Sequence, residues 1–185
     1  HCPEVINAVC DVLEVEATGI PLVVDPVMIA KGGATLLDND GISTLRSRLL
    51  PLASLITPNI PEAETLLGIS INGVDEMKSA AEALAGMGPA AVLVKGGHMD
   101  GNKLTDVLFD AEHFHLFQTE RVETVHTHGT GCTLSSAIAT RLAQGFSLPT
   151  AVETAQAYVG GAIRSAPGYG QGHGPIDHGH NVLPF

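Results

Sequence analysis

Three short apolar runs constrain the fold of this chain more than any other feature. They cover residues 22–24, 55–57 and 91–94, and segments with helical spacing of apolar residues lie between them. A run that is apolar almost throughout, and not only at every second residue, indicates a strand that is buried on both faces. Strands of this kind are typical of a parallel sheet that helices cover. The sequence therefore predicts an α/β protein.

The segments around these runs predict the helices. Pro3 suits the first turn of a helix and Gly19 suits its end. The apolar stripe expected along this helix is Val5, Ile6, Val9, Val12 and Leu13. Further helices are expected over residues 41–49, from Pro61, from an N-cap at Asp75 to Gly88, from a glycine-rich turn before Cys132 to Gly145, and from Pro149.

The pattern changes after Lys95. Residues 104–109 and 114–117 have strand-like patterns on either side of a turn at residues 110–113. Two such runs joined by a short polar turn predict an antiparallel hairpin. We expect this hairpin at one edge of the sheet.

Composition limits what the chain can do. With 185 residues it is long enough for one domain with a sizeable core, and we expect a single domain over residues 1–185 with a Gly- and His-rich tail at 167–185. The formal net charge of −11 argues against nucleic acid and against an anionic membrane as partners. No stretch approaches the roughly 20 apolar residues of a membrane span. The 3 cysteines have no paired spacing, which indicates a reduced, cytoplasmic protein.

A glycine-rich turn at residues 126–131 opens one of the expected helices. The free N–H groups of a helix start and the positive end of its dipole bind phosphate or a developing oxyanion. Cys132 falls in the first turn, where the same field favours a thiolate over a thiol. On this pattern alone, a plain tight turn with a small packed cysteine is an equally good interpretation.

Polar residues follow each of the three buried runs. Asp25 follows the first, Asn59 and Glu62 follow the second, and Lys95 follows the third. Ligands of open α/β sheets bind outside the carboxyl ends of the strands. Carboxylate and amide oxygens suit hydrated magnesium, and a lysine suits a phosphate. Together with the glycine turn, these residues favour phosphoryl transfer, in which positioning and charge neutralisation carry most of the catalysis.

Motifs at these places resemble those of a known family. They are VDPVM at 24–28, LITPN at 55–59, PEAE at 61–64, VKGGH at 94–98, THGTGCTLS at 127–135 and GHGP at 172–175. The chain resembles the hydroxymethylpyrimidine/phosphomethylpyrimidine kinases of thiamine biosynthesis, in the ribokinase-like superfamily. The resemblance implies a three-layer α/β/α sandwich with a mostly parallel central sheet and an antiparallel edge. It also implies ATP and Mg²⁺ as cofactors, a small pyrimidine as substrate, and a homodimer as one assembly to test.

The resemblance also implies roles for the glycine turn and for the last helix. Cys132 is expected to be the catalytic base, and the backbone of Gly129, Thr130 and Gly131 is expected to form the anion hole for the transferred group. Gly160 and Gly161 are expected near the adenine of the nucleotide.

Roles for the strand ends follow in the same way. Asn59 and Glu62 form the Asn-x-x-Glu pair that manages magnesium through water, and Asp25 is expected near both the metal and the phosphates. Lys95 is expected to face the nucleotide phosphates. Val27 is expected to pack beside the pyrimidine.

The family's opening βαβ portion has no counterpart in these residues, so the resemblance describes an N-terminally truncated kinase. Two alternatives stay open. One is a pyridoxal kinase of the same superfamily, some members of which share the cysteine. The other is a catalytically silent module that retains the nucleotide cleft.

Overall fold

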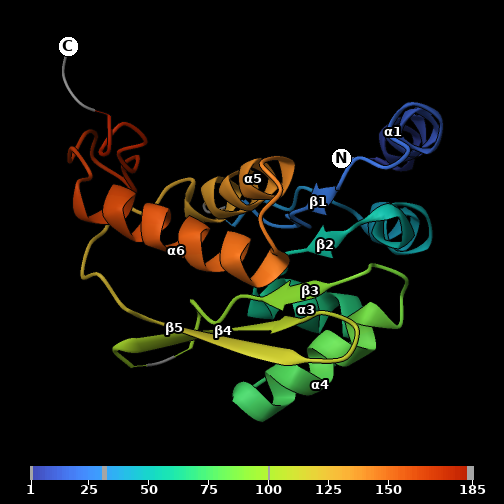
Figure 1. The fold of residues 1–185 in the computed structure, drawn as a ribbon, viewed down its shortest axis with the longest axis horizontal. Coiled ribbons are helices and arrows are strands. Elements are labelled where there is room, and N and C mark those ends of the chain that lie inside the picture. The colour runs from blue at the N-terminus through green and yellow to red at the C-terminus, as the bar shows by residue number, and fades with distance from the viewer. Residues whose placement is uncertain (1, 31–32, 100, 183–185) are drawn as a thin grey trace. The chain divides into compact units, whose positions relative to one another are not determined.

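The computed structural model describes residues 2–30, 33–99 and 101–182 (Figure 1). Its contacts divide the chain into two compact units. The first unit runs from His1 to Gln118 and the second from Thr119 to Phe185. The expectation of a single domain with a tail at 167–185 stays a prediction.

A mixed sheet organises the first unit, and its strands lie in sequence order. They are β1 (Val23–Val24), β2 (Leu55–Ile56), β3 (Val92–Val94), β4 (Lys103–Phe109) and β5 (Phe114–Glu120), the last of which crosses into the second unit. The β1–β2 and β2–β3 pairs are parallel, whereas β3 and β4 pair antiparallel. β5 lies beside β4 at the edge of the sheet, and the Asp110 N–H donates to the His113 carbonyl in the turn between them. The parallel strands and the edge hairpin are therefore both confirmed.

Helices of the first unit pack on this sheet and on one another. They are α1 (Pro3–Glu16), α2 (Asn39–Thr44), a π-helical turn η1 (Leu45–Leu49), a 3₁₀ turn η2 (Leu50–Leu52), α3 (Ile60–Leu67) and α4 (Val74–Ala85). α4 contacts β3, β4 and α3, while α1 contacts α2 and the two turns that follow it. The N-cap of α4 is Gly73, so the predicted cap at Asp75 is wrong; Asp75 lies in the first turn, where the helix dipole favours a carboxylate.

The predicted apolar stripe of α1 is only partly buried. Ile6 and Cys10 are buried, whereas Val5, Val9 and Val12 are 53%, 44% and 60% exposed. The helix turns the Ile6–Cys10 side toward the core, because α2 and η1 lie against that side. Periodicity predicts an apolar stripe but does not say which part of it the neighbouring elements cover.

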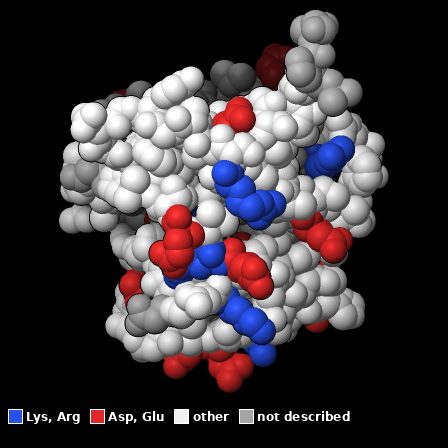
Figure 2. Space-filling view, turned by 90° about the vertical axis from the view of Figure 1, so that its left-hand side faces the viewer, with Lys and Arg blue, Asp and Glu red and all other residues white. Residues whose placement is uncertain are grey.

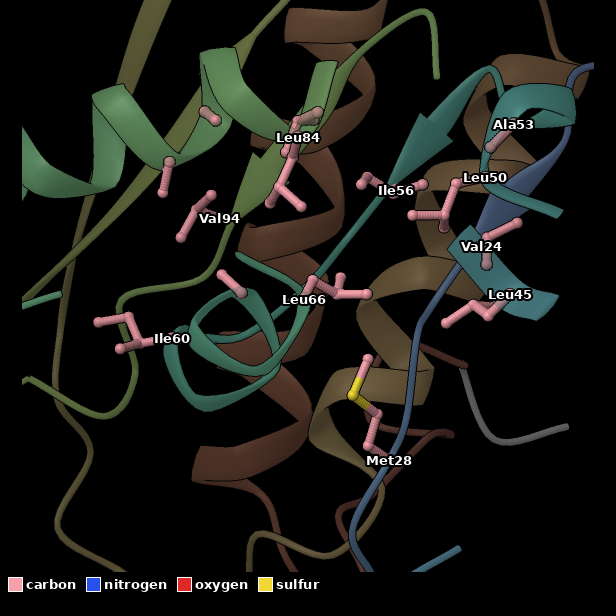
Figure 3. Packing of buried hydrophobic residues seen from close by; sticks show 14 of the residues in the cluster. Val24, Met28, Leu45, Leu50, Ala53, Ile56, Ile60, Leu66, Leu84 and Val94 are labelled. Atoms are coloured by element: carbon pink, nitrogen blue, oxygen red, sulfur yellow. The ribbon is translucent and has the colours of Figure 1, made fainter. Parts of the chain in front are cut away.

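One apolar core holds the first unit together. Ile56, Leu66 and Leu84 come from β2, α3 and α4 and lie in the same cluster of buried side chains (Figure 3). All three are fully buried. This packing fixes the ends of the central strands, where the polar residues of the candidate site begin.

The described part of the second unit contains two helices, α5 (Thr130–Ala143) and α6 (Leu148–Arg164), which pack on each other. The tail is tied to both ends of this pair. The His128 N–H donates to the Gly174 carbonyl, and the Asp177 N–H donates to the Ala162 carbonyl. The segment after α6 therefore closes back on the glycine turn and on α6.

Charged side chains are sparse on the face shown in Figure 2, where both signs occur in small mixed groups. No helix among the described residues has the length and apolar character needed to cross a bilayer.

Candidate functional site

An ion pair joins the ends of β1 and β3. Lys95 Nζ lies 2.8 Å from Asp25 Oδ1, and the Thr57 hydroxyl donates to the same oxygen at 3.0 Å. Thr57 is fully buried, and the Asp25 and Lys95 side chains are each 13% exposed. Because strands β1, β2 and β3 run parallel, their carboxyl ends bring these three residues to one place.

Asn59 and Glu62 start helix α3 through reciprocal hydrogen bonds. The Glu62 N–H donates to Asn59 Oδ1 at 2.9 Å, and the Asn59 N–H donates to Glu62 Oε2 at 2.8 Å. Pro61 in the first turn and left-handed Gly68 at the end set the limits of the helix. This capping box fixes both side chains at the helix start.

The Asn59–Glu62 pair lies beside the ion pair. The Lys95 N–H donates to the Pro58 carbonyl at 2.8 Å, which aligns Lys95 with Asn59. Burial raises the pKa of the Glu62 carboxyl above its usual range, and the Asn59 N–H and the nearby Lys95 ammonium offset part of that rise. The structure therefore brings Asp25, Asn59, Glu62 and Lys95 together, as the sequence predicts.

This donor set suits magnesium held through water. Among the described residues, no three His, Cys, Asp or Glu side chains converge as a direct metal cage. Two carboxylates and an amide beside a lysine fit a hydrated Mg²⁺ that shares its remaining positions with phosphate oxygens. Asp25 and Glu62 each use one oxygen in the bonds above, so each has a second oxygen for such a contact.

Val27 follows Asp25 on the loop after β1. Its N–H donates to the Asp25 carbonyl at 2.8 Å, and its side chain is 38% exposed while the adjacent Met28 is buried. An exposed apolar side chain beside the polar cluster is compatible with a ring-packing role, which stays a prediction.

The glycine turn lies in the second unit and has the expected form. Gly129 is the N-cap of α5 in the left-handed conformation (φ 84°), and no side chain caps the helix. Cys132 is exposed in the first turn. The Gly129 carbonyl accepts from both the N–H and the hydroxyl of Thr133, at 2.9 Å and 2.7 Å. The Thr130 N–H donates to the Thr127 carbonyl at 3.4 Å, and the N–H groups that follow it in the first turn point out of the N-terminus of α5.

Gly160 and Gly161 lie near the C-terminal end of α6, where the tail covers one of them. A Cβ at Gly161 would overlap the imidazole of His180, which also packs on the Tyr158 ring at 5.0 Å. A Cβ at Gly160 would lie 3.3 Å from the Arg164 guanidinium. The close packing of His180 gives a structural reason for glycine at 161, and the expected adenine contact stays a prediction.

The predicted residues thus fall into two sets. Asp25, Asn59, Glu62 and Lys95 belong to the first unit, and the residues of the glycine turn with Cys132 belong to the second. Thr57 was missed by the sequence analysis. A hydroxyl inside an otherwise apolar strand end was the available signal, because a buried hydroxyl needs a partner.

Comparison with known proteins identifies the class. The sequence model of the family described as phosphomethylpyrimidine kinase matches residues 2–177. The chain therefore belongs to the phosphomethylpyrimidine kinase family.

Named relatives agree with this assignment. The chain is 47% identical to the hydroxymethylpyrimidine/phosphomethylpyrimidine kinase of Bacillus subtilis, over 85% of this chain and 58% of that protein. It is 52% identical to the thiamine biosynthesis bifunctional protein ThiED of Geobacter sulfurreducens, over 85% of this chain and 32% of that protein. The chain spans about a third to two thirds of the curated relatives it matches.

Solved structures confirm the ribokinase-like fold class. The pyridoxal kinase of Staphylococcus aureus in complex with AMP-PCP matches with a TM-score of 0.90 at 33% identity, over 98% of this chain and 66% of that one. The phosphomethylpyrimidine kinase of Clostridium difficile matches with a TM-score of 0.75 at 42% identity, over 87% of this chain and 64% of that one.

Proposed function

We propose that this chain forms the nucleotide and metal part of an ATP-dependent kinase that phosphorylates 4-amino-5-hydroxymethyl-2-methylpyrimidine and its monophosphate. One observation carries the proposal: Asp25, Asn59, Glu62 and Lys95 meet at the carboxyl ends of three parallel strands and are held by direct hydrogen bonds. Family membership supports this substrate pair, because the relatives that match carry its name.

Each group has a task in such a reaction. Lys95 binds and orients the phosphates of ATP, and Asn59 and Glu62 hold water molecules on Mg²⁺, with Asp25 beside them. Mg²⁺, when bound, neutralises the phosphate charge that develops during transfer. The N–H groups at the start of α5 stabilise the transferred phosphoryl group, and the Cys132 thiolate accepts the proton of the attacking hydroxyl.

A pyridoxal kinase is the second candidate. Structures of the S. aureus pyridoxal kinase, one of them with AMP-PCP and pyridoxal, match over 98% of this chain. The sequence identity of these structures is 33–34%, against 42–47% for relatives named as hydroxymethylpyrimidine/phosphomethylpyrimidine kinases. We therefore place the pyrimidine first.

A direct comparison of substrates tests the proposal. The whole protein that contains this chain is incubated with ATP and Mg²⁺, and phosphate transfer to hydroxymethylpyrimidine and to pyridoxal is measured under the same conditions. Faster transfer to the pyrimidine is expected. Faster transfer to pyridoxal would reverse the order of the candidates, and nucleotide binding without transfer to either would favour the silent module.

Two finer points belong to the same proposal. The three cysteines carry free thiols, which supports a reducing, cytoplasmic setting.

A homodimer is proposed as the assembly, and sedimentation velocity over a range of concentrations tests it.

A further inference from the structure

The residue after Lys95 is held by a side chain from the neighbouring strand. β3 and β4 pair in a register that ends with Val94 opposite Val107, so the next residues of the two strands lie beside each other. Gly96 is buried, and its N–H donates to Asp106 Oδ1 at 2.8 Å. A buried N–H group needs an acceptor, and at this place a carboxylate supplies it instead of a backbone carbonyl.

Close packing fixes the same glycine from the other side. A Cβ at Gly96 would overlap the Thr105 carbonyl oxygen and lie 3.4 Å from the Met77 methyl carbon. The Met99 N–H donates to the Gly96 carbonyl at 3.0 Å, which closes the turn. Backbone contact with β4 and the bond to Asp106 thus leave the turn little freedom.

Lys95 depends on this turn for its position. Its own N–H is fixed by the Pro58 carbonyl, and its ammonium reaches Asp25. A shift of the next peptide plane would move the Lys95 backbone, and with it the side chain that leaves from it. Asp106 is therefore connected to the proposed phosphate-binding ammonium through the Gly96 N–H and the backbone of Lys95.

We propose that Asp106 is a positioning residue that fixes the turn at Lys95, Gly96 and Gly97 for the phosphates of the nucleotide. The inference rests on the proposed nucleotide site at Lys95, and it does not depend on which acceptor receives the phosphate. Asp106 is not assigned a contact with substrate.

Three variants in the whole protein test this role. Asp106→Ala removes the acceptor, and Asp106→Asn keeps an amide oxygen that can accept the Gly96 N–H. Asp110→Ala is the matched control: Asp110 follows β4 on the same hairpin, and its carboxylate bonds His115 at 2.9 Å instead of the turn. Dissociation constants for Mg·ATP and for adenosine are measured by calorimetry at a temperature where each variant is folded.

The expected result is specific to the phosphates. Asp106→Ala weakens Mg·ATP binding by about ten-fold, the size expected for loss of one charge-assisted hydrogen bond. Adenosine binding stays unchanged, Asp106→Asn restores most of the ATP affinity, and Asp110→Ala binds ATP like the unchanged protein. In turnover assays, the KM for ATP rises with Asp106→Ala while the KM for the phosphate acceptor does not.

Other results overturn the inference. Unchanged ATP affinity in Asp106→Ala would show that Asp106 does not position the turn. Equal losses for ATP and adenosine would show a general structural role. If Asp106→Ala does not fold, an Asp106→Asn protein that folds yet loses ATP affinity would contradict the role of the accepting oxygen.

Failure of the proposed function gives a different pattern. An unchanged protein that binds Mg·ATP but transfers no phosphate to the pyrimidine would contradict the proposed function and leave the Asp106 comparison intact. An unchanged protein that binds no Mg·ATP would contradict both.

Discussion

Lys95 Nζ lies 2.8 Å from Asp25 Oδ1 with both side chains 13% exposed, so the ends of β1 and β3 are joined by a largely buried ion pair. β2 lies between these two strands, and its Thr57 hydroxyl donates to the same Asp25 oxygen. Removing one member of such a pair leaves a charge with little access to water. The pair therefore matters for folding as well as for the proposed chemistry.

The first prediction concerns this pair. Lys95→Met is expected to lower the free energy of unfolding by about 2–3 kcal/mol, because Asp25 then keeps a poorly solvated charge. The double variant Lys95→Met/Asp25→Asn is expected to lose clearly less than the two single variants added together. Urea unfolding of the four proteins measures this coupling.

An exposed pair supplies the control. Lys78 and Asp75 lie 3.2 Å apart with side chains 35% and 93% exposed, so Lys78→Met is expected to change stability by less than about 1 kcal/mol. Strictly additive losses for Lys95 and Asp25 would contradict the buried-pair interpretation.

The second prediction concerns magnesium. Glu62→Gln keeps an oxygen that can accept the Asn59 N–H, so helix α3 is expected to form normally. The lost negative charge is expected to raise the magnesium concentration needed for half-maximal turnover. Glu82→Gln, at an exposed position of α4, is the control. An identical magnesium titration for Glu62→Gln and the unchanged protein would remove Glu62 from the metal site.

The third prediction is a pH dependence. Burial raises the Glu62 pKa in the folded state above the ordinary value of 4.5. The folded state then binds more protons than the unfolded state between the two pKa values, so this group makes stability fall as the pH rises through that interval. Glu62→Gln does not ionise and is expected to gain stability relative to the unchanged protein from about pH 4 to pH 7. Urea unfolding without magnesium across this range measures the difference, and a constant difference would argue against the raised pKa.

The fourth prediction tests the proposed base. A thiol is far more acidic than a hydroxyl, so Cys132→Ser removes the base while keeping the shape of the helix start. General-base catalysis typically contributes about 10²–10⁴-fold, and kcat at saturating substrate is expected to fall by that order. Nucleotide affinity is expected to change little, because the turn from Gly129 to Gly131 remains. Cys2→Ser is the control, and a Cys132→Ser protein with the unchanged rate would leave Cys132 without a catalytic role.

The fifth prediction uses thiol reactivity. Cys132 is exposed, whereas Cys10 is fully buried in the core and burial raises the pKa of its thiol. Iodoacetamide is expected to modify Cys132 much faster than Cys10, and Mg·ATP is expected to slow the reaction at Cys132 alone. Peptide mapping by mass spectrometry resolves the sites. Equal protection of the partly exposed Cys2 would show that ATP acts through a general change in the protein.

The sequence predicted the parts of the site that depend on local patterns. Asp25, Asn59 and Lys95 follow apolar runs, and such runs in parallel strands end at one edge of a sheet. The Asn59–Glu62 spacing is also a local signal, because a helix start places these two residues within hydrogen-bond reach.

Contacts across strands could not be predicted in this way. Thr57 and Asp106 act on partners that lie 32 and 10 residues away in the chain, and only the strand register brings them together. The exposed valines of α1 have the same cause, since neighbouring elements decide which part of an apolar stripe is covered. Sequence patterns identify helices and strands, whereas strand register and packing determine which of their residues come into contact.

The capping box of α3 has one more consequence. Asn59 and Glu62 hold the helix start through each other's N–H groups, and the same two side chains are the proposed magnesium residues. Fraying of the first turn of α3 would therefore break both bonds and separate the two proposed magnesium residues. A bound ion would slow that fraying. Solvent exchange of the Asn59 and Glu62 amide protons would then report, in one signal, both the local opening of the helix and the occupancy of the site.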